Sequence, residues 1–179
     1  MLKKIISGGQ SGADITALEI AALYNLQTGG YAPMGYVTEN GPNLELKNFG
    51  LEECMTSSYA KRSMLNVDNS DGTLAFSFIP SIGTDKTIGY CITKKWQITS
   101  LDITGDVYKP IFIINQDALY RESLPLELKT FIHKNNIETL NVCGHRKSRY
   151  KDIDSIVHWT MRMLFIVLEI SPSLWEEIK

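Results

Sequence analysis

The sequence predicts an α/β fold of three layers, in which a mostly parallel sheet carries helices on both faces. Short apolar segments alternate with helical segments along the chain, which is the order expected of a parallel sheet. The chain opens on such a unit: the apolar segment KKIIS is followed at once by the turn GGQSGAD and then by a helical pattern. In such folds a ligand lies beyond the carboxyl ends of the strands. The turns after the strands are therefore the first candidates for a site.

The pattern of apolar residues gives the position of each element. We expect strands at Lys3–Ser7, Thr28–Tyr31, Asp71–Ile79, Pro110–Ile114 and Thr139–Gly144. Helices are expected at Ile15–Leu26, at Tyr59–Asn69, from the turn Ser81–Thr87 to about Trp96, at Leu124–Asn135 and at Asp152–Ile170, with a short one through Trp175. The first helix should bury a face made of Ile15, Leu18, Ala22 and Leu26. The stretch 32–54 is rich in proline and glycine and should be a loop.

Composition excludes several classes of function. A chain of 179 residues that is 44% hydrophobic and 21% charged predicts a single globular domain, 1–179. A net charge of -2 argues against duplex nucleic acid as a partner. No apolar run reaches the roughly 18 residues of a membrane span, and the apolar N-terminal run is too short for a signal peptide, so we expect a cytoplasmic protein. Cys54, Cys91 and Cys143 are widely spaced, which predicts buried thiols and no directly bound metal.

The first glycine turn is the strongest candidate for a phosphate site. Glycines let backbone N–H groups approach an anion, and the start of the next helix adds further donors. Gly8, Gly9 and Gly12 suit such a cradle, and Gln10 and Ser11 could add side-chain hydrogen bonds. The other interpretation is a tight structural turn with Asp14 near the helix start.

Three further segments carry polar groups that could reach the same crevice. Gly83 and Thr84 lie in a second glycine turn after a strand. The loop 141–151 contains Arg146 among four basic residues, and a guanidinium offers a planar fork of donors to phosphate. The stretch 59–73 places Arg62, Asn66 and Ser70 on one stripe of a helix, followed by Asp71. A solvated helix face and a solvated basic loop are the structural alternatives.

Taken in order, these segments resemble the SLOG superfamily, and most closely its branch of molybdenum-cofactor carriers. The similarity spans about Lys3 to Leu168. It rests on GGQSGAD, TGG, APMG, the Tyr59–Thr73 run, Gly83-Thr84 with Thr87, and the segment Asn141–Ser148. The last segment departs from the branch, which prefers proline at His145, an acidic residue at Lys147, and Pro-Gly at Lys151-Asp152. The second turn also lacks a doubled glycine, since Ile82 precedes Gly83.

The resemblance implies a Rossmann-like sheet, dimers or tetramers, and a site for a molybdenum-cofactor-like or nucleotide-derived ligand. The residues expected to bind it are Gly8, Gly9, Gln10, Ser11, Gly12, Asp14, Gly29, Gly30, Arg62, Asn66, Ser70, Asp71, Gly83, Thr84, Asn141, Gly144, Arg146 and Ser148.

Two other functions stay open beside ligand binding. A related SLOG branch, the LOG phosphoribohydrolases, cleaves the base from a nucleoside monophosphate with a glutamate that follows a Gly-Thr turn. Here Asp85, Lys86 and Thr87 follow Gly83-Thr84, so that glutamate is absent and Asp85 or Asp14 would have to act as the acid. The sequence therefore favours binding over hydrolysis. The third reading is a scaffold protein whose glycine turns are purely structural.

Overall fold

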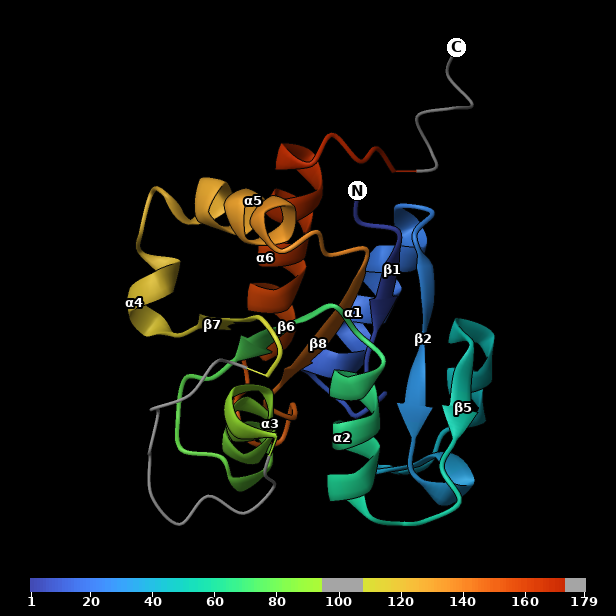
Figure 1. Ribbon diagram of the computed structural model, residues 1–179. Helices are drawn as coiled ribbons and strands as arrows, with labels where there is room; N and C mark the ends of the chain where they lie inside the picture. The colour runs from blue at the N-terminus through green and yellow to red at the C-terminus, as the bar shows by residue number, and fades with distance from the viewer. Residues whose placement is uncertain (95–107, 173–179) are drawn as a thin grey trace.

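A computed structural model describes residues 1–94 and 108–172, and its centre is one sheet of six parallel strands (Figure 1). The strand order is β5-β2-β1-β8-β6-β7. The strands are β1 (Lys4–Ile6), β2 (Gln27–Ala32), β5 (Leu51–Glu53), β6 (Gly72–Phe76), β7 (Ile111–Ile114) and β8 (Thr139–Gly144). A small hairpin, β3 (Val37–Thr38) and β4 (Gly41–Pro42), forms a separate two-stranded sheet.

Helices cover both faces of this sheet, which confirms the predicted three-layer, Rossmann-like architecture. The helices are α1 (Ala13–Leu23), α2 (Tyr59–Asp68), α3 (Ile82–Thr93), α4 (Gln116–Leu119), α5 (Leu124–Lys134) and α6 (Ile153–Val167), with short 3-10 turns η1 (Met34–Tyr36) and η2 (Leu44–Phe49). Helix α6 packs against α1 and α5, while α2 and α3 pack against each other on the opposite face (Figure 1). None of the helices in the two described ranges is long and apolar enough to cross a membrane.

Strand β8, the last strand in the described residues, lies in the interior of the sheet. Strand β8 pairs with β1 on one side and β6 on the other, so that Asn141 is aligned with both Ile6 and Thr73. The turns after β1, β6 and β8 therefore meet at one edge of the sheet, because parallel strands point the same way.

Helix α1 is buried more completely than its sequence pattern predicts. Leu18 is buried and Ile15 is half-buried, as expected, but Ala22 is exposed. Ala13, Ala17 and Ala21 are fully buried instead, in the main core with residues of β8 and α6. Small side chains allow this close packing, and a hydrophobicity pattern ranks them below isoleucine and leucine.

The stretch 32–54 is not the plain loop that its prolines and glycines predict. It contains the β3–β4 hairpin, η2 and the edge strand β5. Strand β5 has only three residues, of which Leu51 alone is buried, so it shows no alternating pattern. The short helix α4 was also not predicted, and the helix expected through Trp175 lies outside the described residues.

Gly12 joins the first turn directly to the loop after β8. Its φ is +82°, and a Cβ there would lie 2.6 Å from the carbonyl oxygen of His145 and 2.7 Å from the amide nitrogen of Lys147. The N–H of Ala13 donates to that same carbonyl at 3.1 Å. Since the neighbours are backbone atoms, they cannot move aside as a flexible side chain could.

We therefore expect Gly12→Ala to destabilise the protein much more than Gly41→Ala. Gly41 also has a positive φ, +99°, but a Cβ there meets nothing within 4 Å. Gly41→Ala should cost only the backbone penalty of about 1–2 kcal/mol, and Gly12→Ala should add the clash, about 1–3 kcal/mol more. Urea unfolding of the two variants measures both costs, and equal losses would contradict the close packing at Gly12.

Candidate functional site

A pocket of about 350 Å³ opens where the turns after β1, β6 and β8 meet the amino-terminal half of α2. The predicted residues that line it are Gln10, Asp14, Arg62, Gly83, Thr84, Gly144 and Arg146. It is also lined by Tyr59, Ala60, Ser63, Ser81, Ile82, Thr87, Cys143 and Arg149. Segments far apart in sequence thus form the walls of one hollow.

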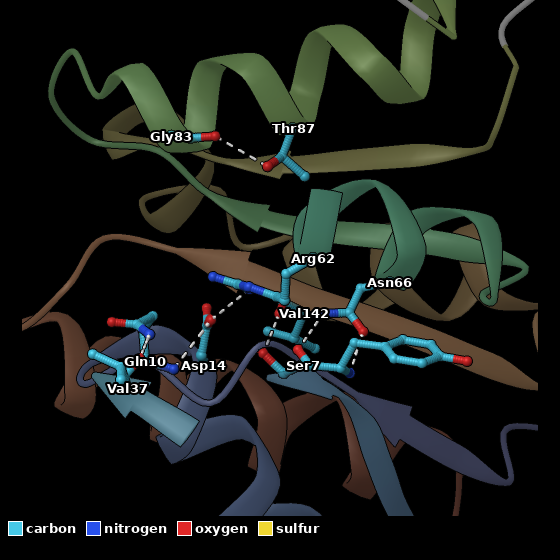
Figure 2. Close-up of polar contacts among 10 residues, drawn as sticks. Ser7, Gln10, Asp14, Val37, Arg62, Asn66, Gly83, Thr87 and Val142 are labelled. Atoms are coloured by element: carbon cyan, nitrogen blue, oxygen red, sulfur yellow. Dashed lines mark hydrogen bonds and ion pairs between the residues drawn. The ribbon is translucent and has the colours of Figure 1, made fainter. Parts of the chain in front are cut away.

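A buried ion pair forms the floor of the pocket. Arg62 Nη1 on α2 lies 3.3 Å from Asp14 Oδ2 on α1, and their side chains are only 9% and 6% exposed (Figure 2). The guanidinium passes directly over Gly8, where a Cβ would lie 1.3 Å from Nη1. Gly8 is therefore required by the position of Arg62, which gives it a role other than the predicted phosphate cradle.

The floor keeps polar atoms that have no protein partner. Among the described residues, Arg62 Nε and Gln10 Oε1 are buried without a hydrogen bond, although Gln10 Nε2 donates to the carbonyl oxygen of Val37 at 3.0 Å. Burial raises the pKa of the Asp14 carboxyl, although Arg62 and the N–H of Gln10 act in the opposite direction. An unpaired buried donor and acceptor cost free energy unless a ligand or water satisfies them.

The predicted second turn is the first turn of helix α3. Gly83 and Thr84 are helical residues, and a Cβ at Gly83 would meet nothing within 4 Å. The first amides of a helix have no acceptor within it, and the N-cap residue Ser81 provides no side-chain cap here. This helix start therefore faces the pocket with donors available.

Three arginines give the pocket its charge. Arg146 and Arg149 come from the loop after β8, and Arg62 comes from α2. The guanidinium carbon of Arg146 lies 4.9 Å from the ring centre of Tyr59, a cation–π contact. Asp14 is the only carboxylate among the lining residues, so the pocket suits an anion.

His145 has a role that sequence reasoning missed. It is 2% exposed, and its Nε2 accepts hydrogen bonds from the backbone N–H groups of Phe78 at 2.9 Å and Ile79 at 3.3 Å. It thereby fixes the loop after β8 to the segment that leads into α3. The basic residues around it in sequence suggested a solvated loop and gave no sign of this contact.

Glu39 joins two predicted ligand residues to each other. Ser11 and Ser148 both donate their hydroxyls to its carboxylate, and the amide of Ser148 adds a hydrogen bond at 3.4 Å. Burial raises the pKa of Glu39, but these hydrogen bonds outweigh it and the net pKa is lowered. Neither serine lines the pocket.

The remaining predicted residues lie outside the pocket lining. Asn66 exchanges two hydrogen bonds with the backbone of Tyr31 and so holds α2 against β2. Ser70 and Asp71 lie just before β6, at the end of the strands opposite to the pocket. There the Asp71 carboxylate accepts hydrogen bonds from the amides of Glu138 and Thr139. Asn141 Nδ2 donates to Thr73 Oγ1 within the sheet.

The other glycines serve close packing as well. A Cβ at Gly9 would strike Leu46 and Leu51, and one at Gly30 would lie 2.2 Å from the carbonyl oxygen of Ser7. Gly29 pairs with Ile6 in the sheet. Together with Gly12, these residues bring the segments together without lining the pocket themselves.

Within the two described ranges, no group of three or more His, Cys, Asp or Glu side chains could hold a metal ion. Cys54 and Cys91 are buried as predicted, whereas Cys143 is half-buried and lines the pocket.

Comparison with known proteins places the chain in a family. Residues 5–165 match the model of the circularly permutated YpsA SLOG family. The chain belongs to this family. Its fold also matches the 1.45 Å crystal structure of a protein from Syntrophus aciditrophicus SB named "Putative molybdenum carrier protein", with a TM-score of 0.78, 30% sequence identity, and 91% of this chain and 94% of that chain covered. No curated protein matches the chain.

We expect His145 to make the stability of this SLOG protein depend on pH. Burial is the main factor that lowers the pKa of His145 below its ordinary value of 6.5. The folded protein thus binds this proton less readily than the unfolded chain, so stability should be complete above pH 6.5 and fall as the pH drops towards the folded pKa. Urea unfolding between pH 7.5 and 5 should show this loss.

Two variants isolate the effect. His145→Gln replaces the ring by a group that does not titrate but can still accept a hydrogen bond, and it should flatten the dependence on pH in this range. His133→Gln changes an exposed histidine and should leave the wild-type dependence in place. An identical pH profile for all three proteins would mean that His145 is not the responsible group.

Proposed function

We propose that this protein binds a small ligand that carries a phosphate, either molybdenum-cofactor-like or nucleotide-derived. The observation that carries the proposal is two sets of donors that line the pocket: the buried, unpaired Arg62 Nε and the first amides of α3, which receive no side-chain cap from Ser81. Both can donate to one oxyanion, and a helix start adds a favourable dipole. Arg146 and Arg149 add positive charge around it.

We propose that the phosphate lies at the start of the third helix and not, as the sequence suggested, at the start of the first. At α1, the amide of Ala13 is already bonded to His145, and the amide of Gln10 lies 3.4 Å from the Asp14 carboxylate. The Asp14 carboxylate would also repel an anion there. At α3, Gly83 leaves open space beside the free amides, so a phosphate can approach them closely.

The name of the Syntrophus protein supports the molybdenum-cofactor side of the proposal. The organic part of that cofactor carries a phosphate, which fits the arginines of this pocket. The protein supplies no metal-ligand cluster within the described residues, so the phosphate and the organic ring would be the parts that are held.

We propose homo-dimers or homo-tetramers as the assembly, which light scattering after size-exclusion chromatography can check.

The test is binding of guanosine monophosphate (GMP) to the wild type and to Gly83→Ala. Guanine shares its fused 2-amino-oxopyrimidine ring with pterins, so one probe represents both ligand classes. The added methyl group meets no protein atom within 4 Å, so folding stability should be kept, but it would occupy the approach to the α3 amides. We expect GMP affinity, measured by calorimetry, to fall at least tenfold.

Gly41→Ala is the matched control, since it adds the same methyl group in open space outside the pocket. It should bind GMP as the wild type does. Two negative results together would reject the proposal. The wild type would fail to bind GMP, and protein purified without added ligand would show no phosphate-bearing ligand in its mass spectrum.

A hydrolase remains the second candidate because of Asp14. It is the only carboxylate among the lining residues, and burial raises its pKa, as a general acid requires. Asp85 does not line the pocket and instead accepts from the amide of Ser81 at 3.0 Å. Thr87 donates to the carbonyl oxygen of Gly83 at 3.0 Å and has no carboxylate to offer.

If the protein is a hydrolase, it should release free guanine from GMP, which chromatography detects. Asp14→Asn should abolish release because it removes the acid, whereas Asp85→Asn should retain it. Absence of guanine release from a wild type that binds GMP would eliminate hydrolysis of this nucleotide and leave the binding function.

A further inference from the structure

We propose that Tyr59 and Arg146 form a stacking platform for a planar heteroaromatic ring, and that the pocket therefore selects heterocyclic phosphates over plain sugar phosphates. This inference rests on the proposed function and names the part of the ligand beyond its phosphate.

The most deeply buried polar groups of the pocket lie at its floor. Asp14, Arg62 and Thr84 are all less than 10% exposed. The proposed phosphate site lies beside these groups, at the start of α3. The rest of the ligand must extend towards the more exposed lining residues.

Two of those more exposed residues are large and apolar, and they lie beside the exposed Arg149 and the half-buried Arg146. Tyr59 is 39% exposed and Ile82 is 78% exposed, and both line the pocket, one at the start of α2 and the other at the start of α3. Large apolar side chains left exposed beside a pocket indicate a surface that a ligand covers. An aromatic ring and an aliphatic chain suit a flat, weakly polar group better than a sugar.

Arg146 makes the platform specific for a planar group. Its guanidinium carbon lies 4.9 Å from the ring centre of Tyr59, so a flat cation is stacked on a flat ring at the pocket wall. A heterocycle can add to this stack through the part of Tyr59 that remains exposed. Stacking of a base on an aromatic side chain raises affinity roughly 5- to 150-fold.

The experiment compares GMP with ribose 5-phosphate, which has the same phosphate and sugar but no heterocyclic base. For the wild type we expect GMP to bind at least tenfold more tightly in calorimetry. Tyr59→Leu should reduce this ratio of affinities about tenfold, because it keeps an apolar side chain but removes the ring. Tyr59→Phe keeps the ring and should keep the ratio. A general loss of structure would weaken both ligands together and leave the ratio unchanged.

A second variant tests the same platform from its other side. Arg146→Lys keeps the positive charge but removes the planar guanidinium, so it should also lower the ratio, by several-fold. Equal affinity of the wild type for GMP and ribose 5-phosphate would overturn the platform and leave phosphate binding intact. An unchanged ratio in Tyr59→Leu would overturn it as well, provided that this variant binds ribose 5-phosphate as tightly as the wild type does. Failure of both ligands to bind would reject the proposed function together with this inference.

Discussion

The buried contact between Asp14 and Arg62 is the constraint on which the site depends. Asp14 lies in the first turn of α1, on one face of the sheet, and Arg62 belongs to α2 on the other face. A buried guanidinium without a counter-charge would be strongly unfavourable, so each residue fixes the other. Because Arg62 crosses above the first turn, Gly8 can carry no side chain. The position of the pocket floor follows from this one pair.

The backbone around this pair is fixed by contacts that leave little freedom. Gly12 lies against the loop after β8, and His145 ties that loop to the segment before α3. Glu39 holds Ser11 and Ser148 from the outside. These contacts order the walls before any ligand arrives, which lowers the entropy that binding must overcome. Ser11, Glu39, His145 and Ser148 therefore shape the site without lining it.

The sequence allowed most of the architecture to be predicted, because β1, β6, β7 and β8 are rich in apolar residues and the long helices have clear ends. It failed at β5 and α4, which are too short to show a pattern. A parallel sheet brings the turns after β1, β6 and β8 to the same end of the strands. Asp14, Arg62, Gly83 and Arg146 could therefore be chosen from the sequence as candidate site residues. The roles of Glu39 and His145 could not, since each depends on partners more than 25 residues away in sequence. The roles of the glycines were still harder to predict. A glycine that leaves space for a ligand and one that leaves space for a neighbouring side chain look the same in a sequence.

The central position of β8 has a consequence for how the chain is made. On one side of it, β5, β2 and β1 form a three-stranded unit, and on the other side β6 and β7 form a pair. These two parts share no strand pairing until β8 is inserted between them. A ribosome produces β8 after all the other strands of this sheet, so the nascent chain holds two unjoined sheet fragments with open edges from the synthesis of β7 until β8 is made. Unpaired strand edges invite association with other chains, and the final strand closes both at once.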